Sequence, residues 1–247
     1  RHLPLLQRLS RWRVYWFNEL VGMGFMGSAA IQRMLKRLSN LHLRRQVPHV
    51  EMREALTPNF NPGCKRLLIS NTWFPALQRH NVQLVTQAVG GIAPNGVVGA
   101  DGTLYPCDVI IWGTGFKATE FVAPMQIYGA ASVGAGEGNQ PELGAAWRSN
   151  PAASHLGITV AGFPNLFLLV GPNTGLGHNS IVFMIECQVD YIVRALGSLR
   201  DRKLPVLQLR ADVQRQDYAV VQQKMKGTVW SSGCKSWYQH ADGRIDT

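Results

Sequence analysis

The chain has 247 residues, of which 46% are hydrophobic and 16% are charged, and its formal net charge is +10 at pH 7. This balance is typical of a globular protein with a sizeable core and excludes a disordered or fibrous chain. The positive charge attracts phosphates, but it does not distinguish nucleic acid from lipid or from a dinucleotide.

Four cysteines are scattered along the chain without a C-x-x-C pair: Cys64, Cys107, Cys187 and Cys234. This spacing argues against a zinc site or a disulfide framework and favours a reducing, cytoplasmic location. The longest apolar stretch, residues 158–171, is broken by glycine, proline and asparagine, so we expect no membrane span. The sequence begins without Met or a signal peptide, and we expect it to be cut from a longer protein.

Two helices are expected at the beginning of the chain, over residues 3–20 and 29–45. Pro4 suits the first turn of a helix, and apolar residues recur at helical spacing in the second segment. Residues 22–27 between them match the G-x-G-x-x-G dinucleotide pattern by letter. That pattern functions after a strand and before an acidic residue, whereas here it follows a helix and Val47 stands at the acidic position. We therefore interpret it as a joint between helices.

Short β-type runs follow Pro48. Residues 67–70, 82–86 and 97–98 have strand composition, and turn signals occur at 94–96 and 101–102. Residues 108–113 and 165–170 are continuous apolar runs, which are typical of buried strands in an α/β sheet.

Glycine-rich segments follow both buried runs, at Gly113-Thr114-Gly115 and over residues 171–180. A long helix is expected at 181–199 and a last one at 211–226, with a loop at 129–144. A strand, a glycine-rich turn and a helix in succession direct free backbone N–H groups at a bound phosphate or polar ring edge.

Lys65 and Arg66 are adjacent cations that follow a Pro/Gly-rich loop, where we expect a strand to begin. In a strand they would point to opposite faces, so that one could reach a cofactor phosphate and the other a cleft. Two adjacent cations can equally be a solvated pair. His178 and Glu186 lack a third metal ligand nearby, and we expect no metal site.

Several ordered segments together resemble the Baeyer–Villiger monooxygenase family, which is related to flavin-containing monooxygenases. They are Leu56-Thr57-Pro58, Gly63-Cys64-Lys65-Arg66, Trp73-Phe74-Pro75-Ala76-Leu77, Asn81-Val82-Gln83-Leu84-Val85, Asp108-Val109-Ile110-Ile111-Trp112-Gly113-Thr114-Gly115-Phe116, Gly162-Phe163-Pro164-Asn165-Leu166-Phe167, Gly171-Pro172-Asn173-Thr174, Gly177-His178-Asn179-Ser180 and Ser236-Trp237-Tyr238. Gly113 replaces the alanine that is usual in the family's D-x-I-I-x-A-T-G-F stretch. The resemblance extends from about Arg1 to Gly243.

The resemblance implies an α/β fold made of the C-terminal parts of two interleaved Rossmann-like domains that bind FAD and NADPH. Residues 1–116 are expected to be the returning part of the NADPH domain, with a helical insertion at 1–46. Residues 117–247 are expected to close the FAD domain. The glycine fingerprints, the F-x-G-x-x-x-H motif and an active-site Asp of the family are absent from this sequence.

The resemblance also implies roles for individual residues. Arg66 is expected near the flavin, where its permanent charge stabilises the negative charge that develops during attack on the substrate. Lys65 is expected at the 2′-phosphate or ribose of NADPH, and Trp237 over the bound nicotinamide cofactor. The remaining expected cofactor-binding residues are Thr114, Gly115, Gly171, Asn173, Asn179 and Ser180, the last four of them along the pyrimidine edge of the flavin.

The implied reaction uses NADPH and O₂ to insert an oxygen beside a ketone carbonyl, giving an ester or lactone. One alternative is a flavin monooxygenase that acts on nitrogen or sulfur, against which the segment 63–66 argues. Another is a non-catalytic basic module that binds nucleic acid, for which the charge is not accompanied by a recognition motif. The sequence identifies neither the ketone nor the oligomeric state.

Overall fold

The computed structural model describes residues 4–130, 140–175, 177–234, 236–239 and 243–245. It contains both helices and sheet and divides into two compact units, which are described separately below. The first unit comprises residues 1–35, 60–67 and 117–247, and the second comprises 36–59 and 68–116. The division falls within one long helix, so that helix contributes to both units.

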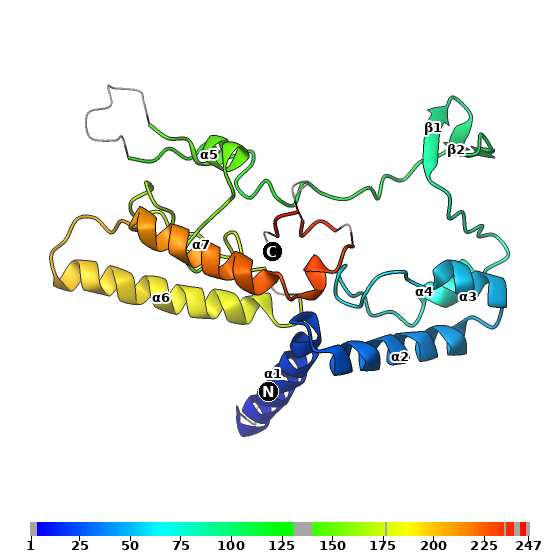
Figure 1. Cartoon of the computed structure of the whole chain (residues 1–247), viewed down its shortest axis with the longest axis horizontal. Coiled ribbons are helices and arrows are strands. Elements are labelled where there is room, and N and C mark those ends of the chain that lie inside the picture. Colours follow the sequence, from blue (N-terminus) through cyan, green and yellow to red (C-terminus); the bar gives the residue numbers. More distant parts are fainter. Residues whose placement is uncertain (1–3, 131–139, 176, 235, 240–242, 246–247) are drawn as a thin grey trace. The chain divides into compact units, whose positions relative to one another are not determined.

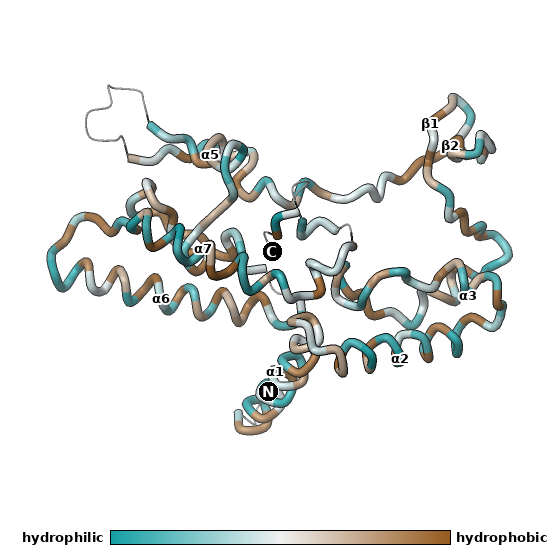
Figure 2. Tube along the Cα trace, viewed as in Figure 1, coloured by the Kyte–Doolittle hydropathy of each residue, from teal (hydrophilic) through white to brown (hydrophobic). Residues whose placement is uncertain are grey.

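The first unit is mainly helical (Figure 1). Its elements are α1 (Pro4–Phe25), the beginning of α2 (Ala29–Gln46), α5 (Leu143–Ser149), α6 (Ile181–Asp201), α7 (Ala211–Met225) and the 3₁₀ turn η1 (Val229–Ser231). All four long helices were expected from the sequence, although α1 continues to Phe25, beyond its expected end at residue 20. In Figure 2, α2 carries hydrophobic bands between hydrophilic ones, which is the pattern of a helix with one apolar face.

A tight turn joins α1 to α2. The second and third positions of the glycine pattern, Gly24 and Gly27, lie in the last turn of α1 and in the turn itself, so no strand precedes them. Gly27 has φ +102°, a conformation that favours glycine, and a Cβ there would meet the carbonyl oxygen of Gly227 at 2.5 Å. The prediction of a joint between helices is confirmed.

Two clusters of buried residues form the core of this unit. The first contains Phe25, Cys64, Val229, Trp230 and Ile245. The second contains Val122, Leu143, Val160 and Phe163. The first cluster draws on four segments that are distant in sequence, so the position of residues 60–67 depends on packing against α1 and the C-terminal segment.

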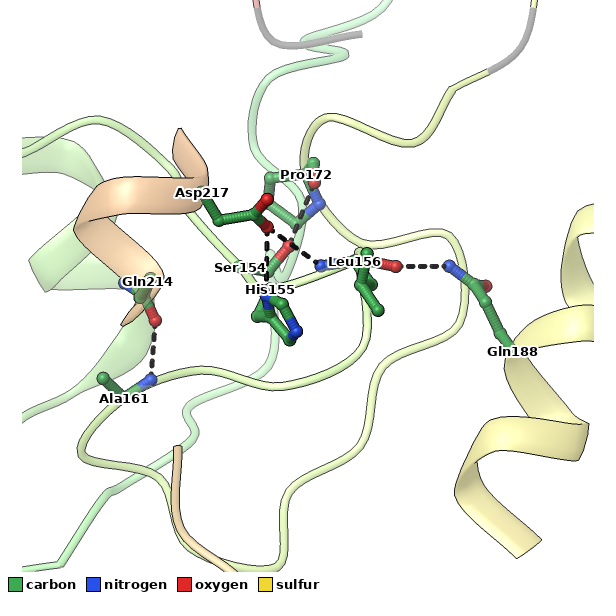
Figure 3. Close-up of polar contacts among 8 residues, drawn as sticks. All are labelled: Ser154, His155, Leu156, Ala161, Pro172, Gln188, Gln214 and Asp217. Atoms are coloured by element: carbon green, nitrogen blue, oxygen red, sulfur yellow. Dashed lines mark hydrogen bonds and ion pairs between the residues drawn. The ribbon is translucent and has the colours of Figure 1, made fainter. Parts of the chain in front are cut away.

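A polar network fixes the irregular segment 152–172 to α6 and α7 (Figure 3). Gln188 of α6 is 3% exposed; its Oε1 accepts from Val170 N at 2.8 Å, and its Nε2 donates to the Leu156 carbonyl at 3.1 Å. On α7, Gln214 Oε1 accepts from Ala161 N at 2.7 Å, and Asp217 Oδ2 lies 3.1 Å from His155 Nδ1. Partly buried backbone groups without sheet partners thus obtain hydrogen bonds from helix side chains.

The second unit contains the rest of α2, two short helices and a small sheet. These are α3 (Val50–Leu56), α4 (Trp73–Leu77) and the antiparallel strands β1 (Val89–Ala93), β2 (Gly96–Gly99) and β3 (Leu104–Pro106), in the order β1-β2-β3. The expected turns at 94–96 and 101–102 connect these strands. In the second turn Asp101 accepts hydrogen bonds from Thr103 N and Oγ1, which lowers the pKa of its carboxyl.

Four of the five predicted strands do not form among the described residues. Residues 67–70, 82–86, 108–113 and 165–170 have no strand structure, and of the predicted runs only 97–98 lies in a strand. The apolar residues of the first and third segments are exposed, including Ile69 at 100% and Ile111 at 91%. A buried parallel strand needs hydrogen-bonding neighbours on both sides, and the described residues supply none for these segments.

The cysteines also differ from expectation. Cys64 and Cys234 form a disulfide, whereas Cys107 and Cys187 are free and exposed. The scattered spacing argued against a disulfide, but that argument applies to local pairs, and these two cysteines are 170 residues apart. The inference from cysteine spacing to a reducing compartment therefore loses its basis. No helix within the described ranges is both long and apolar enough to cross a membrane.

Candidate functional site

A cavity of about 390 Å³ in the first unit brings together four of the residues singled out from the sequence. Arg66, Gly171, Asn179 and Trp237 lie on its wall. The other lining residues are Ala118, Thr119, Phe121, Val170, Gly175, Ile181 and Tyr238. Its size is within the range of small-molecule pockets, and none of the lining residues is acidic.

Arg66 supplies the positive charge of the cavity. Within the described part of the chain its guanidinium has no ion-pair partner, so the charge is available to a ligand. The segment before it is held by Gly63, whose φ is +90° and at which a Cβ would collide with the ring of Phe25. Residues 65–66 are not in a strand, contrary to expectation, because the described residues supply no neighbouring strand for them.

Trp237 is the end of a series of aromatic contacts. Trp237 is 44% exposed, and its ring meets Tyr238 edge to face at 5.9 Å between centroids. Tyr238 meets Trp230 at 5.9 Å, and Trp230 meets Phe25 at 6.2 Å. Edge-to-face contacts add to burial, so the series connects Trp237 to the first core cluster while leaving much of its ring available.

The N-terminus of α6 forms another part of the wall. Ser180 is the N-cap, and its Oγ accepts from Phe183 N at 3.4 Å, while Ile181 lines the cavity. The N-terminus of a helix of 21 residues carries partial positive charge and free N–H groups. Together with Arg66, it makes the cavity suited to an anionic or electron-rich group.

Asn179 is held by a residue that sequence analysis did not single out. Its Nδ2 donates to Glu19 Oε1 of α1 at 2.6 Å, and its Oδ1 accepts from Ser180 N at 2.8 Å. The same Glu19 oxygen lies 3.7 Å from Nε2 of His178, a largely buried side chain. Glu19 therefore orients the two residues that precede the N-cap of α6.

Three other predicted cofactor-binding residues lie in the first unit but do not line this cavity. Lys65 places its Nζ 4.7 Å from the centroid of the Phe60 ring. Asn173, at φ +66°, donates to the Ala152 carbonyl at 3.3 Å and accepts from Gln222. Ser180 caps α6 and lines a different cavity, between α1 and α6.

Thr114 and Gly115 belong to the second unit. Both are exposed, and Gly115 has φ +105° with no atom within 4 Å of the position that a Cβ would take. The turn expected after residues 108–113 is therefore free of packing. Residues 131–139 of the expected loop at 129–144 lie outside the described residues.

Glu19 and Gln188 are the functional candidates that sequence reasoning missed. Each acts on residues beside the cavity through a hydrogen bond to a distant segment: Glu19 to Asn179, 160 residues away, and Gln188 to Val170. Neither belongs to a local motif. One signal in the sequence could have indicated Gln188: a polar residue at a helix position that otherwise faces the core.

No protein-family model matches the chain. Known proteins nevertheless match it along most of its length. A Baeyer-Villiger monooxygenase of Pseudomonas aeruginosa is 39% identical over 241 residues, which is 97% of this chain and 44% of that protein. A Baeyer-Villiger monooxygenase of Streptomyces coelicolor is 34% identical over 254 residues, covering 100% of this chain and 46% of that protein. An FAD-binding monooxygenase of Aspergillus niger is 34% identical over 95% of the chain and 37% of that protein.

Solved structures share the fold. OTEMO in complex with FAD and NADP superposes with a TM-score of 0.75 at 23% identity, over 89% of this chain and 40% of that one. An oxidised steroid monooxygenase bound to NADP gives 0.73 at 24% identity, over 90% and 41%. A closed cyclohexanone monooxygenase gives 0.73 at 22%, over 90% and 40%.

These three relatives are named as monooxygenases, and this chain spans less than half of each. Over nearly its whole length the chain is homologous to part of Baeyer–Villiger monooxygenases.

Proposed function

We propose that this chain forms part of a flavin-dependent monooxygenase that uses NADPH and O₂ to insert an oxygen beside a ketone carbonyl, giving an ester or lactone. The observation that carries the proposal is the cavity in which Arg66, Gly171, Asn179 and Trp237 meet from three separate segments. Its support in sequence is 39% identity to a Baeyer-Villiger monooxygenase over 97% of the chain.

The residues of the cavity fit one end of a dinucleotide cofactor. The lining is free of carboxylates, contains a guanidinium, begins a helix and includes an exposed indole ring. Such groups suit a flat, electron-rich ring, and about 390 Å³ suits a ring system but not a whole dinucleotide. The flavin, when bound, supplies the activation of oxygen and the electron transfer from NADPH.

The protein groups would then have separate tasks. Arg66 would hold a positive charge beside the reacting oxygen and stabilise the negative charge that develops when it attacks the carbonyl. The N-terminus of α6 would hydrogen-bond the edge of the ring, with Asn179 kept in place by Glu19. Trp237 would cover the nicotinamide cofactor and exclude water. In the same proposal Lys65 would contact its phosphate or ribose, and Thr114 and Gly115 would approach a cofactor through exposed backbone.

The fold would correspond to the C-terminal parts of two interleaved nucleotide-binding domains, divided near residue 116. Support comes from the exposed apolar segments 67–70 and 108–113, which have the composition of central strands but no partners within the described ranges. The relatives, more than twice as long as the region matched here, contain additional sequence that could supply such partners.

The test compares Arg66→Ala and Arg66→Lys in the flavoprotein that contains this chain. Ester formation from cyclohexanone and 2-octanone is measured by gas chromatography, and NADPH oxidation is measured by absorbance. We expect Arg66→Ala to lower ester formation by about 10²–10³-fold while NADPH oxidation continues in part, as for loss of a group that stabilises transition-state charge. Arg66→Lys should retain an intermediate rate, because it keeps a charge without the planar fork.

Three outcomes would contradict the proposal. Full ester formation by Arg66→Ala would remove the assigned role of Arg66. Oxygenation of thioanisole or dimethylaniline, without any ketone product, would favour a monooxygenase acting on sulfur or nitrogen. A purified protein without flavin absorption between about 350 and 500 nm would overturn the proposed cofactor chemistry as a whole.

A further inference from the structure

The disulfide between Cys64 and Cys234 lies in the first core cluster. Cys64 is fully buried there among Phe25, Val229 and Trp230, and Cys234 is half-buried at the edge. The bond joins segments 170 residues apart. One is the segment 60–67, and the other is the C-terminal segment after η1.

Each cysteine lies two or three residues before a residue of the candidate site. Arg66 follows Cys64 by two residues, Trp237 follows Cys234 by three, and both line the same cavity. Neither Arg66 nor Trp237 lies in a helix or strand. Regular backbone hydrogen bonding therefore fixes neither residue, and their relative position depends on the contacts around the disulfide.

The C-terminal segment also has non-covalent anchors. Ile245 is buried in the first core cluster, and its carbonyl accepts from Gln222 Nε2 of α7 at 2.9 Å. The contacts nearer to Trp237 are more local. Tyr238 meets Trp230 edge to face, and the side chain of Gln239 donates to the Trp230 carbonyl. Gln239 N donates to the Ser236 carbonyl at 3.2 Å. These three contacts, which lie close to Trp237, hold the segment to itself or to η1. Within the described part of the segment after η1, the disulfide is the covalent connection between it and the segment that carries Arg66.

We propose that the Cys64–Cys234 disulfide is a positioning link that keeps Arg66 and Trp237 on the wall of one cavity, and that its reduction releases the C-terminal segment. The functional part of this inference rests on the proposed function. Reduction by a dithiol is balanced: the S–S bond breaks, each cysteine sulfur receives one electron and one proton, and the dithiol becomes a disulfide. Because Cys234 is half-buried, it is the sulfur that a reductant can approach.

The first experiment tests the bond without any cofactor. The protein is purified without reductant, unfolded and alkylated before and after treatment with dithiothreitol, and its peptides are mapped by mass spectrometry. We expect only the free, exposed Cys107 and Cys187 to be alkylated before reduction, and all four cysteines afterwards. Alkylation of Cys64 and Cys234 before reduction, even in air-oxidised protein, would overturn the link.

The second experiment tests its effect on the site. Cys64→Ala/Cys234→Ala is compared with the matched control Cys107→Ala/Cys187→Ala, which removes the two free thiols. Hydrogen exchange is followed over residues 232–239, and the KM for NADPH and kcat are measured in the flavoprotein. We expect faster exchange in this segment and a KM raised about three- to tenfold when the bond is removed, because binding must then order the segment again. The control should match the unmodified protein in both.

Two results would overturn the positioning role. Unchanged exchange over 232–239 would show that the segment is held without the bond. A lower melting temperature with an unchanged KM would show that the bond stabilises the fold and does not position the site. If instead the protein binds no flavin or NADPH, the proposed function fails, while alkylation and hydrogen exchange still decide whether the link exists and holds the segment.

Discussion

Gln188 shows how one side chain can determine the geometry beside the cavity. Its side chain bonds partly buried backbone groups of Val170 and Leu156, both of which have a positive φ of 55°. The contact with Leu156 is drawn in Figure 3. Such φ values are strained for residues with a Cβ and persist only where surrounding contacts impose them. Val170 is a lining residue and directly precedes Gly171, so the strain is located at the wall of the candidate site.

We therefore predict that Gln188→Leu destabilises the first unit. The leucine fills a similar volume but leaves the Val170 N–H and the Leu156 carbonyl without this partner. An unsatisfied buried group costs about 1–3 kcal/mol, and because these two groups are only partly buried we expect a total loss of about 1–2 kcal/mol. Gln223→Leu, at an exposed position of α7, is the matched control and should change stability by less than about 0.5 kcal/mol. Urea unfolding followed by circular dichroism measures both. Equal stability of the two variants would mean that Val170 keeps its conformation without Gln188.

At the scale of elements, the crossing of α1 with the segment before α6 depends on a helical glycine. A Cβ on Gly22 would lie 2.5 Å from Cδ2 of His178, the residue that Glu19 also contacts. Gly197 is also within a helix, α6, but nothing lies within 4 Å of its Cβ position. A comparison of substitutions at the two glycines thus separates the effect of helix propensity from the effect of tertiary packing.

Replacing these two glycines with alanine should change the stability of the protein in opposite directions. Gly197→Ala should stabilise the protein by about 0.5–1 kcal/mol, because alanine has the higher helix propensity. Gly22→Ala should destabilise it by about 1–2 kcal/mol, because overpacking against the imidazole outweighs that gain. Thermal unfolding measures the difference. Stabilisation by Gly22→Ala would show that His178 can move away without cost.

The elements that sequence analysis identified correctly are those determined by local pattern. The helix at 29–45 follows from the spacing of Ile31, Met34 and Leu35, and the hairpin turn at 94–96 follows from Pro, Asn and Gly. The run 108–113 has the composition of a buried strand, but a strand forms only with hydrogen-bonding neighbours, which a single segment cannot specify. The composition of residues 108–113 gives them a high strand propensity, but without neighbouring strands among the described residues they do not form a strand.

The candidate site divides in the same way. Arg66, Gly171, Asn179 and Trp237 stand in recognisable motifs and line one cavity. The contact between Glu19 and Asn179 and the bond between Cys64 and Cys234 join residues that are 160 and 170 positions apart, so no local motif contains both partners. Contacts of that separation depend on how the helices pack, and no pattern within a short window contains that information.

At the scale of the whole molecule, the exposed apolar segments need an explanation. Ile69 and Ile111 are almost fully exposed in runs whose composition is typical of central strands. Patches of this kind mark surfaces that are covered by other protein or that cause aggregation. Under the proposed function, further sequence of the flavoprotein covers residues 108–113 as neighbouring strands.

This explanation predicts opposite effects of one substitution in two contexts. When the chain is produced alone, Ile111→Lys should reduce its aggregation and its binding of a hydrophobic dye, because a charge replaces an exposed apolar side chain. In the flavoprotein the same substitution should impair folding and flavin retention, because the lysine would be buried without a partner at a cost of several kcal/mol. Val193→Lys, at a 60% exposed position of α6, is the control and should leave flavin content unchanged. Light scattering and flavin absorbance per chain measure the two effects. A flavoprotein that tolerates Ile111→Lys would show that residues 108–113 remain at the surface, and the apolar run would then need another partner.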